Sequence, residues 1–393
     1  MSSITYDVKD CHHVVVGAAV LGSGGGGSYE DALQLVSELS QQVKECQIVV
    51  SDYAEHSNAY VFAMMGSPDA AQDMPLSTVE HAISNTLHAI AKAALPPPSS
   101  LIPIEIGPLN SLMPLLAAAL DESGTLSVIN GDGAGRAVPQ LQQTTFADAS
   151  TLSPSPCIVA NTGKNKLTRL SVSIEASNAS QAETLAGGCV GAFKGYAGIA
   201  LWPSNSTNHY ALLNHYIRGT LEQTRQLGEF LSSAELPLSD TVVAKKIKAL
   251  TGRTAEVVAS NVFITAISQE TLTSLDTGLI QLDDHPDPSI SKQRFYTYNK
   301  NESLLLYSAD RAAPLISAPD SVCYYSESTG RGFTNALIDT APYFDAAKQK
   351  STGRAVSIIK VATHPALADS PGINASFANL LRSIGYAGAL NPA

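Results

Sequence analysis

The first 140 residues of the chain alternate between short apolar runs and helical patterns, and each of four apolar runs ends in a turn that contains glycine. These turns occupy residues 22–27, 66–69, 107–110 and 131–136. The alternation predicts a largely parallel sheet. If the runs are strands, all four turns meet at one edge of the sheet, which is where open α/β sheets bind their ligands. We therefore expect the ligand site at that edge.

The same pattern predicts the elements of the N-terminal part. Strands are expected over residues 14–16, 46–50, 59–64, 101–106 and 126–129, and helices from Ser28 onward, over 77–95 and around 112–120. Ser28 is a preferred N-cap residue, and Glu30 and Asp31 favour the positive end of a helix. Pro96 ends the second helix, because proline cannot continue the hydrogen-bond ladder.

The pattern changes at a turn over residues 161–166. Beyond it, β-rich runs at 171–174 and 321–325 mix with helical stretches at 210–231 and 241–250. A chain of 393 residues exceeds the size at which a single core stops growing. We predict an α+β protein with two domains: an N-terminal α/β domain over residues 1–160, with a largely parallel sheet, and a C-terminal β-rich mixed domain over residues 161–393. Five glycines between Gly187 and Gly198 predict a tight backbone excursion in place of a regular helix.

The charge balance limits the partners. With 24 Lys and Arg against 35 Asp and Glu, the chain has no basic surplus to neutralise phosphates, so nucleic acid and anionic membranes are poor partners. No apolar run approaches the roughly 20 residues that span a bilayer. The amino terminus does not resemble a secretory signal, and the five cysteines are scattered without a Cys-x-x-Cys pair. We expect a cytoplasmic homo-oligomer, a dimer or a tetramer, that binds a small molecule.

The glycine run at residues 22–27 has three interpretations. It matches the dinucleotide fingerprint, with Asp52 at the end of the next predicted strand as the ribose-binding acid. No lysine follows the last glycine, which excludes a phosphate-binding P-loop. The run is otherwise a structural tight turn, or a cradle for an anion or carboxylate.

Two acids in this part of the chain are candidates for chemistry. We expect Asp132 to be exposed at a strand end, as a general base, a metal ligand or a substrate anchor; the alternative is a turn in which its carboxylate binds local backbone N–H groups. Glu105 lies in an apolar run, where a lone buried carboxylate is costly unless it is paired or functional. Arg136 would bind a carboxylate or carbonyl group, or pair with Asp132. Asn110 would contact the ligand or cap the next helix.

In their order along the chain, these motifs resemble the family of S-methyl thiohydantoin desulfurases. The resemblance rests on residues 20–27, 66–68, 104–107 with Asn110, and 131–139, and it continues at 301–304, 319–322 and 329–330. It covers the whole chain in outline. The resemblance implies hydrolysis at carbon C2 of a five-membered thiohydantoin ring, with release of a thiol and formation of a hydantoin. Related domains occur alongside enzymes of the hydantoinase and oxoprolinase type.

Such a reaction needs an activated water, donors for the developing negative charge and contacts to the ring amides. Asp132 or Glu105 would be the base. The donors and ring contacts would come from Gly24, Gly25, Gly26, Gly27, Ser67, Asn110 and Arg136. A divalent metal on Asp132 is a further option, although the sequence shows no ligand set. Two other classes stay open: a dinucleotide-dependent oxidoreductase, and a non-catalytic protein that binds a small metabolite or an enzyme partner.

We expect the N-terminal sheet to carry the chemistry and the C-terminal domain to cover or complete the pocket, because all four turns lie before residue 140. On this view Asp132→Asn should lower turnover by about 10²-fold and leave stability nearly intact. If it lowers stability with unchanged turnover instead, Asp132 is a turn residue and Glu105 becomes the leading base.

Overall fold

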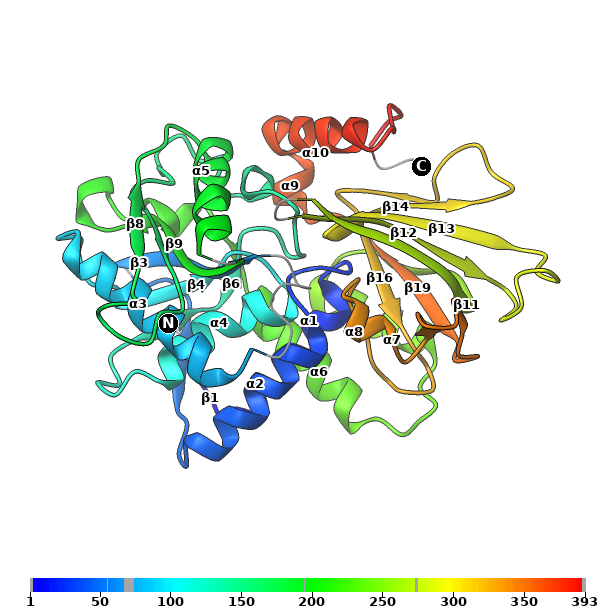
Figure 1. Cartoon of the computed structure of the whole chain (residues 1–393), viewed down its shortest axis with the longest axis horizontal. Coiled ribbons are helices and arrows are strands. Elements are labelled where there is room, and N and C mark those ends of the chain that lie inside the picture. The colour runs from blue at the N-terminus through cyan, green and yellow to red at the C-terminus, as the bar shows by residue number, and fades with distance from the viewer. Residues whose placement is uncertain (1–2, 55, 67–73, 194, 273–274, 391–393) are drawn as a thin grey trace.

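The computed structural model describes residues 3–54, 56–66, 74–193, 195–272 and 275–390. Over these residues the chain forms an α+β protein with two domains side by side, each with its own large sheet (Figure 1). This fold class is the one that the sequence predicts. The described part of the first sheet has eight strands, in the order β1 (Ser3–Tyr6), β2 (Ile48–Ser51), β5 (Ser127–Ile129), β4 (Ser100–Pro103), β3 (Ala59–Gly66), β9 (Tyr196–Ser204), β7 (Cys157–Ala160) and β8 (Ser171–Ile174).

The centre of this sheet is parallel, as the alternation of strands and helices predicts. β2, β5, β4 and β3 run parallel to one another. Antiparallel strands extend both sides, with β1 next to β2, and β9, β7 and β8 beyond β3. Since β8 and β9 follow residue 160, the first sheet continues past the boundary that we predicted there.

Helices cover both faces of the first sheet. Along β3, Tyr60 and Phe62 join the core cluster formed with α1 (Val8–Leu21), α2 (Tyr29–Gln42), α3 (Leu76–Lys92) and α4 (Pro108–Ala119). Val61 and Ala63 point to the other face and join the cluster formed with α5 (Ala179–Ala192). The division follows the period of two in a strand, in which successive side chains face opposite ways.

Two local predictions were wrong. Residues 14–16 lie inside α1 and not in a strand; Asp7 and Asp10 form a capping box at its start. A continuous apolar run does not by itself distinguish a strand from a helix that is buried on most sides. Gly187 and Gly191 lie inside α5, a regular helix that Asn178 caps, where Ala182 and Ala186 form part of the buried face. The glycine run 22–27 therefore follows a helix and not a strand.

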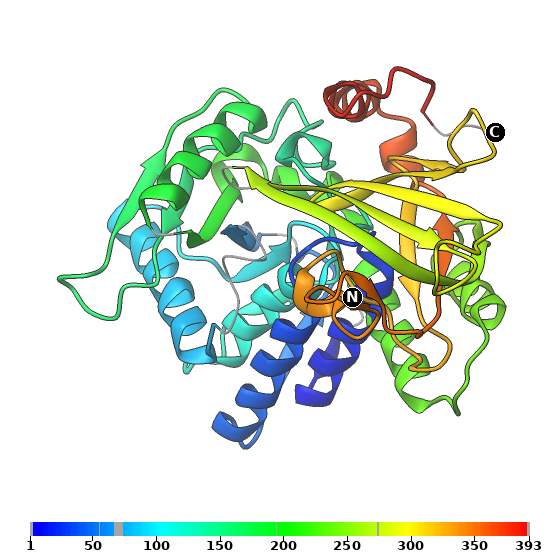
Figure 2. The same ribbon diagram turned by 45° about the vertical axis from the view of Figure 1, so that its right-hand side comes forward.

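The second domain is built on an antiparallel sheet. Among the described residues it has seven strands, in the order β15 (Ile316–Ser317), β14 (Glu302–Ser308), β13 (Arg294–Lys300), β12 (Leu275–Asp283), β11 (Ala255–Leu272), β19 (Val356–Val361) and β16 (Ser321–Tyr325). Figure 2 shows its long yellow strands, with the red helix α10 (Pro371–Ser383) above them. The remaining elements are β6 (Gly131–Asp132) with β10 (Ile217–Arg218), β17 (Phe344–Asp345) with β18 (Lys350–Ser351), α6 (Thr220–Ser233), α7 (Asp240–Thr251), α8 (Leu337–Thr340) and α9 (Pro365–Ala368).

The helices α1 and α6 connect the two domains. A Cβ atom on Gly17 would lie 2.0 Å from the Thr224 carbonyl oxygen, and one on Gly228 would lie 1.7 Å from that of His13, so only glycine allows the two helices to pack this closely. The same core cluster includes Cys323 of β16 and Ile359 of β19. The two helices thus form a layer shared by both sheets.

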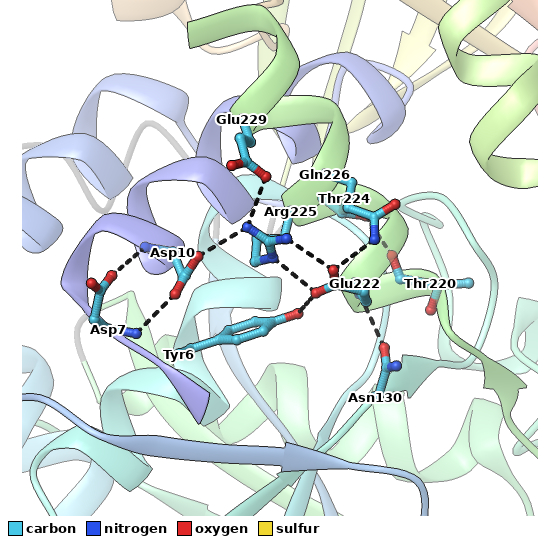
Figure 3. Close-up of polar contacts among 10 residues, drawn as sticks. All are labelled: Tyr6, Asp7, Asp10, Asn130, Thr220, Glu222, Thr224, Arg225, Gln226 and Glu229. Carbon is cyan, nitrogen blue, oxygen red and sulfur yellow. Dashed lines mark hydrogen bonds and ion pairs between the residues drawn. The ribbon is translucent and has the colours of Figure 1, made fainter. Parts of the chain in front are cut away.

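A set of charged side chains also joins this layer to the first sheet (Figure 3). Arg225 of α6 donates to Glu222, Asp10 and Glu229 at 2.9–3.1 Å, and the Tyr6 hydroxyl donates to Glu222 at 2.6 Å. We call these five residues the Arg225 cluster. No helix in the described residues is long and apolar enough to cross a membrane.

Candidate active site

A cavity of about 700 Å³ lies between the first sheet and the start of β14. Its walls come from the glycine turn after α1, the end of β3, the segment that links β4 to α4, one face of α5, and the turn between β13 and β14. The residues that carry the argument below are Gly26, Gly27, Glu105, Asn110, Glu183, Gly188, Gly191 and Glu302. Of the predicted site residues, the cavity brings together Gly26, Gly27, Glu105 and Asn110.

Glu105 is held in the cavity wall by two donors. It is 4% exposed, its Oε1 atom accepts from Asn110 Nδ2 at 2.7 Å, and its Oε2 atom accepts from the Val138 backbone N–H at 2.7 Å. Burial raises the pKa of Glu105 to about 7, although both hydrogen bonds oppose the rise. Asn110 does not cap α4, whose N-cap residue is Gly107. Its amide instead orients the Glu105 carboxyl group.

Glu302 faces the same cavity from the other domain. Its carboxyl is 3% exposed; Oε1 accepts from the Gly26 N–H at 3.3 Å, and Oε2 has no hydrogen-bond partner among the described residues. Burial, followed by the negative charge of Glu105, raises the pKa of Glu302 well above its usual range. A buried carboxyl with one weak donor and no cation in contact favours the protonated form. Both of these carboxyls therefore have a raised pKa, and Glu105 alone of the two has a pair of donors that favour its ionised form.

The glycine turn holds the Glu302 strand in place. The Ser303 N–H donates to the Ser23 carbonyl at 2.7 Å, and the Asn335 N–H donates to the Gly24 carbonyl at 2.8 Å. A Cβ atom on Gly25 would lie 2.2 Å from Glu302 Oε1, so glycine leaves the room that this carboxyl occupies. Gly24 and Gly25 thus face the second domain, whereas Gly26 and Gly27 line the cavity.

Comparison with known proteins gives the family. The S-Me-THD-like N-terminal domain matches residues 9–169, and the S-Me-THD-like C-terminal domain matches residues 176–375. The chain belongs to the S-Me-THD-like family. A crystal structure of a protein from Chromobacterium violaceum has a TM-score of 0.78 to this chain at 22% identity, over 100% of both chains, and shows that the two share a fold. No curated protein matches the chain at a significant level.

The motifs by which the sequence resembles the S-Me-THD family include both cavity carboxyls, within residues 104–107 and 301–304. Glu302 lies in the motif at residues 301–304 but was not among the predicted site residues, because a single acid before an apolar strand carries no functional signal of its own. Its partner, Glu105, lies almost two hundred positions away in the sequence. Ser67, another predicted contact, lies outside the described residues.

Asp132 lies elsewhere, and the expectation that it is exposed was wrong. It is fully buried; its carboxylate accepts from the Ala134 and Gly135 N–H groups at 2.8 Å and from the Thr220 hydroxyl at 2.7 Å. Burial raises the pKa of Asp132 to about 6, against these hydrogen bonds and the positive charge of Arg253. Asp132 does not line the cavity. Its contacts tie the 131–136 turn to the start of α6, as in the turn that we gave as the alternative.

Arg136 is also buried behind the cavity and does not line it. Its guanidinium donates to the backbone carbonyls of Ala137, Ser303, Pro319 and Asp320 at 2.8–3.2 Å. It binds carbonyl groups, as the sequence suggested, but they belong to the backbone of this chain, and no hydrogen bond joins Arg136 to Asp132. The described residues contain no group of three or more His, Cys, Asp or Glu side chains arranged to bind a metal.

Proposed function

We propose that this protein hydrolyses an S-methyl thiohydantoin or a closely related cyclic amide, with release of a thiol. Membership of the S-Me-THD-like family suggests the substrate class. The observation that carries the mechanism is the pair of buried carboxyls in one cavity: Glu105 accepts two hydrogen bonds, whereas Oε2 of Glu302 has no partner among the described residues. Such pairs supply a base and an acid at the same time.

In the proposed reaction, the Glu105 carboxylate takes a proton from water as the water oxygen bonds to ring carbon C2. The electron pair of the C2–nitrogen double bond moves to the ring nitrogen, which takes the proton of Glu302. The C2–sulfur bond then breaks, and the methylthio group leaves with the proton held by Glu105. The new C2 hydroxyl returns its proton to Glu302 as the carbonyl forms. Water and the S-methyl thiohydantoin become a hydantoin and methanethiol, and both carboxyls regain their starting states.

The surrounding groups support these roles. Asn110 Nδ2 and the Val138 N–H donate to Glu105 and favour its ionised form, as a base requires. The free Oε2 atom of Glu302 is the position from which a proton can be donated. The Gly26 N–H donates to Glu302, so in this proposal it orients the acid and does not bind the ring.

The glycine run does not have the setting of a dinucleotide site. That fingerprint needs a strand before the glycines, and here α1 precedes them. Oxidoreductase activity and non-catalytic binding are the alternatives that the experiment below distinguishes from hydrolysis. A cytoplasmic location and a homo-oligomeric state stay predictions, which cell fractionation and light scattering can check.

The deciding experiment measures thiol release from an S-methyl thiohydantoin with a thiol reagent. Wild-type protein should release the thiol, and Glu302→Gln should lower kcat by about 10²-fold, the contribution of a positioned acid. Glutamine suits this site structurally, because its oxygen keeps the Gly26 bond and its NH₂ group replaces an atom that has no partner. Glu235→Gln, at an exposed glutamate, is the control. Tight NAD binding without thiol release would contradict the proposal.

A further inference from the structure

A third carboxyl lines the cavity and has no part in the proposed reaction. Glu183 projects from α5, across the cavity from the two catalytic candidates, and is half-buried. The backbone N–H of Leu141 favours the ionised form of Glu183. Burial raises the pKa of Glu183 to about 8, the charge of Glu105 raises it further, and the charge of Lys300 at the end of β13 opposes the rise.

The described residues that line the cavity include three glutamates, Glu105, Glu183 and Glu302, and no Lys, Arg or His. Lys300 is close enough to influence Glu183 electrostatically but does not line the cavity. The cavity is more than an acidic cluster, because Oε2 of Glu302 is buried in it without a partner. The buried Arg136 acts on Glu105 and Glu302 from behind the cavity, so among the described residues a ligand that enters the cavity meets carboxyl groups and no cation in its lining.

The α5 wall beside Glu183 leaves space. Gly188 and Gly191 both line the cavity, and a Cβ atom on either would meet no described atom within 4 Å. The hydroxyls of Ser180 and Thr184 lie on the same wall. A five-membered ring held at Glu105 and Glu302 would therefore leave room along α5 for a chain attached to the ring.

We propose that the α5 wall binds the substituent of the ring and that Glu183 selects substrates whose substituent carries a positive charge, such as an amine or guanidinium on a short alkyl chain. This inference rests on the proposed function. In a site of low dielectric constant a carboxylate attracts a cation strongly, whereas a carboxylate on the substrate would meet three acidic groups. Because Glu183 favours its proton in the empty cavity, the arriving cation displaces that proton to solvent.

The test compares three S-methyl thiohydantoins with substituents of similar length: aminobutyl, pentyl and carboxypropyl. The wild-type kcat/KM should be about tenfold higher for the amine than for the pentyl compound, and lowest for the acid, since tenfold corresponds to about 1.4 kcal/mol of discrimination. Glu183→Gln should remove the preference through KM, so that the amine and pentyl compounds react with equal kcat/KM. Glu175→Gln, at an exposed glutamate just before α5, is the control. Equal rates on the amine and pentyl compounds, or a preference that persists in Glu183→Gln, would overturn the inference.

Binding of the hydantoin products separates this inference from the proposed reaction. Calorimetry with aminobutyl and pentyl hydantoins, in two buffers of different ionisation enthalpy, should show tighter binding of the amine and release of a proton to the buffer. Both effects should disappear in Glu183→Gln. If the amine binds tighter while no S-methyl compound releases a thiol, the charge selection stands and the reaction fails. Equal binding of the two hydantoins would overturn the charge selection even if thiol is released.

A change at Gly191 tests the position of the substituent. Gly191→Leu places a side chain in the open space beside α5, and leucine favours a helix more than glycine does. It should raise KM more for the aminobutyl and pentyl compounds than for the unsubstituted ring. An equal rise for all three would show that the substituent does not lie along α5.

Discussion

Glu222 in the Arg225 cluster and Glu302 in the cavity are both poorly accessible carboxyls, but their surroundings shift their pKa values in opposite directions. Burial alone would raise the pKa of Glu222, but hydrogen bonds from Arg225, Tyr6 and Gln226 outweigh it and lower that pKa. Burial, followed by the charge of Glu105, raises the pKa of Glu302, which has one long hydrogen bond and no cation in contact. The two acids differ both in burial, which is deeper at Glu302, and in partners, because only Glu222 has an ion pair.

This difference separates two uses of a buried acid. In the Arg225 cluster the charges are satisfied within the protein and hold β1, α1 and α6 together (Figure 3). In the cavity, a carboxyl oxygen is left without a partner, at a cost to folding that a structural role does not require. A ligand that forms a hydrogen bond to such an unsatisfied group gains binding free energy there, which marks the group as a candidate for function.

The sharpest test of the comparison replaces one acid from each region. Glu105→Gln should lower the kcat of thiol release by about 10²-fold or more, because the base is lost. Glu222→Gln should leave turnover per folded molecule unchanged and lower the free energy of unfolding by about 1–3 kcal/mol, because an amide NH₂ then faces donors. Thiol release and urea denaturation, measured on both variants, check the division. Equal losses of kcat in the two variants would remove the distinction between the regions.

The pH dependence gives the next largest effect. Since Glu105 must be ionised to act as a base and its pKa is raised to about 7, kcat/KM should rise about tenfold per pH unit below pH 7 and level off above it. The free energy of unfolding should change in the opposite direction. The pKa of Glu105 is about 7 in the folded state and about 4.3 in the unfolded state. Its contribution to stability is therefore complete below pH ~4.3 and is lost as the pH rises to about 7.

For Glu222 the sign is reversed, because its folded pKa is lowered. Its contribution to stability is present above the unfolded value and is lost as the pH falls through the folded value. Thermal melts of Glu222→Gln against wild type at about pH 3 and about pH 7 measure this contribution. The loss of stability should be larger at the higher pH.

For Glu105, the pH dependence of activity is the decisive measurement. A kcat/KM that does not change with pH would argue against Glu105 as the base.

Asp132→Asn now has a different expected result from the one that the sequence suggested. Both carboxylate oxygens accept from backbone N–H groups, so an NH₂ group at this position would face donors in a buried turn. We expect a loss of about 1–3 kcal/mol in stability and normal turnover per folded molecule. Urea denaturation together with thiol release on the folded fraction checks this. A 10²-fold loss of kcat at unchanged stability would restore Asp132 as a catalytic group.

Tyr6→Phe should have the smallest effect. It removes the hydroxyl that donates to Glu222 at 2.6 Å, while Arg225 and Gln226 still donate to that carboxylate. The expected cost is about 1 kcal/mol, with no change in thiol release. A double-mutant cycle with Glu222→Gln isolates the pair. If the two changes are additive, the hydroxyl does not stabilise the cluster through Glu222.

The sequence alone predicted much of the fold, and the reason is periodicity. The helical pattern over residues 77–95 located α3, and Ser28 marked the start of α2, because both signals act within a few residues of the chain. The same local reasoning failed at α1. Its apolar run fits a buried strand and a buried helix equally well, and only packing against α2, α4 and α6 decides between them.

For the site, the sequence by itself determined that Glu105 and Asn110 lie close together, since they lie within a few residues of each other at the end of one strand. It placed the glycine turn beside them on a premise that was wrong, because α1 and not a strand precedes that turn. The tertiary structure decided the rest. Whether Asp132 is exposed depends on α6, whose Thr220 binds it, and whether Glu105 has an acidic partner depends on β14 of the other domain. Proton affinity is set by burial and by the charges within a few ångströms, and the chain brings those charges together from positions that are far apart in the sequence.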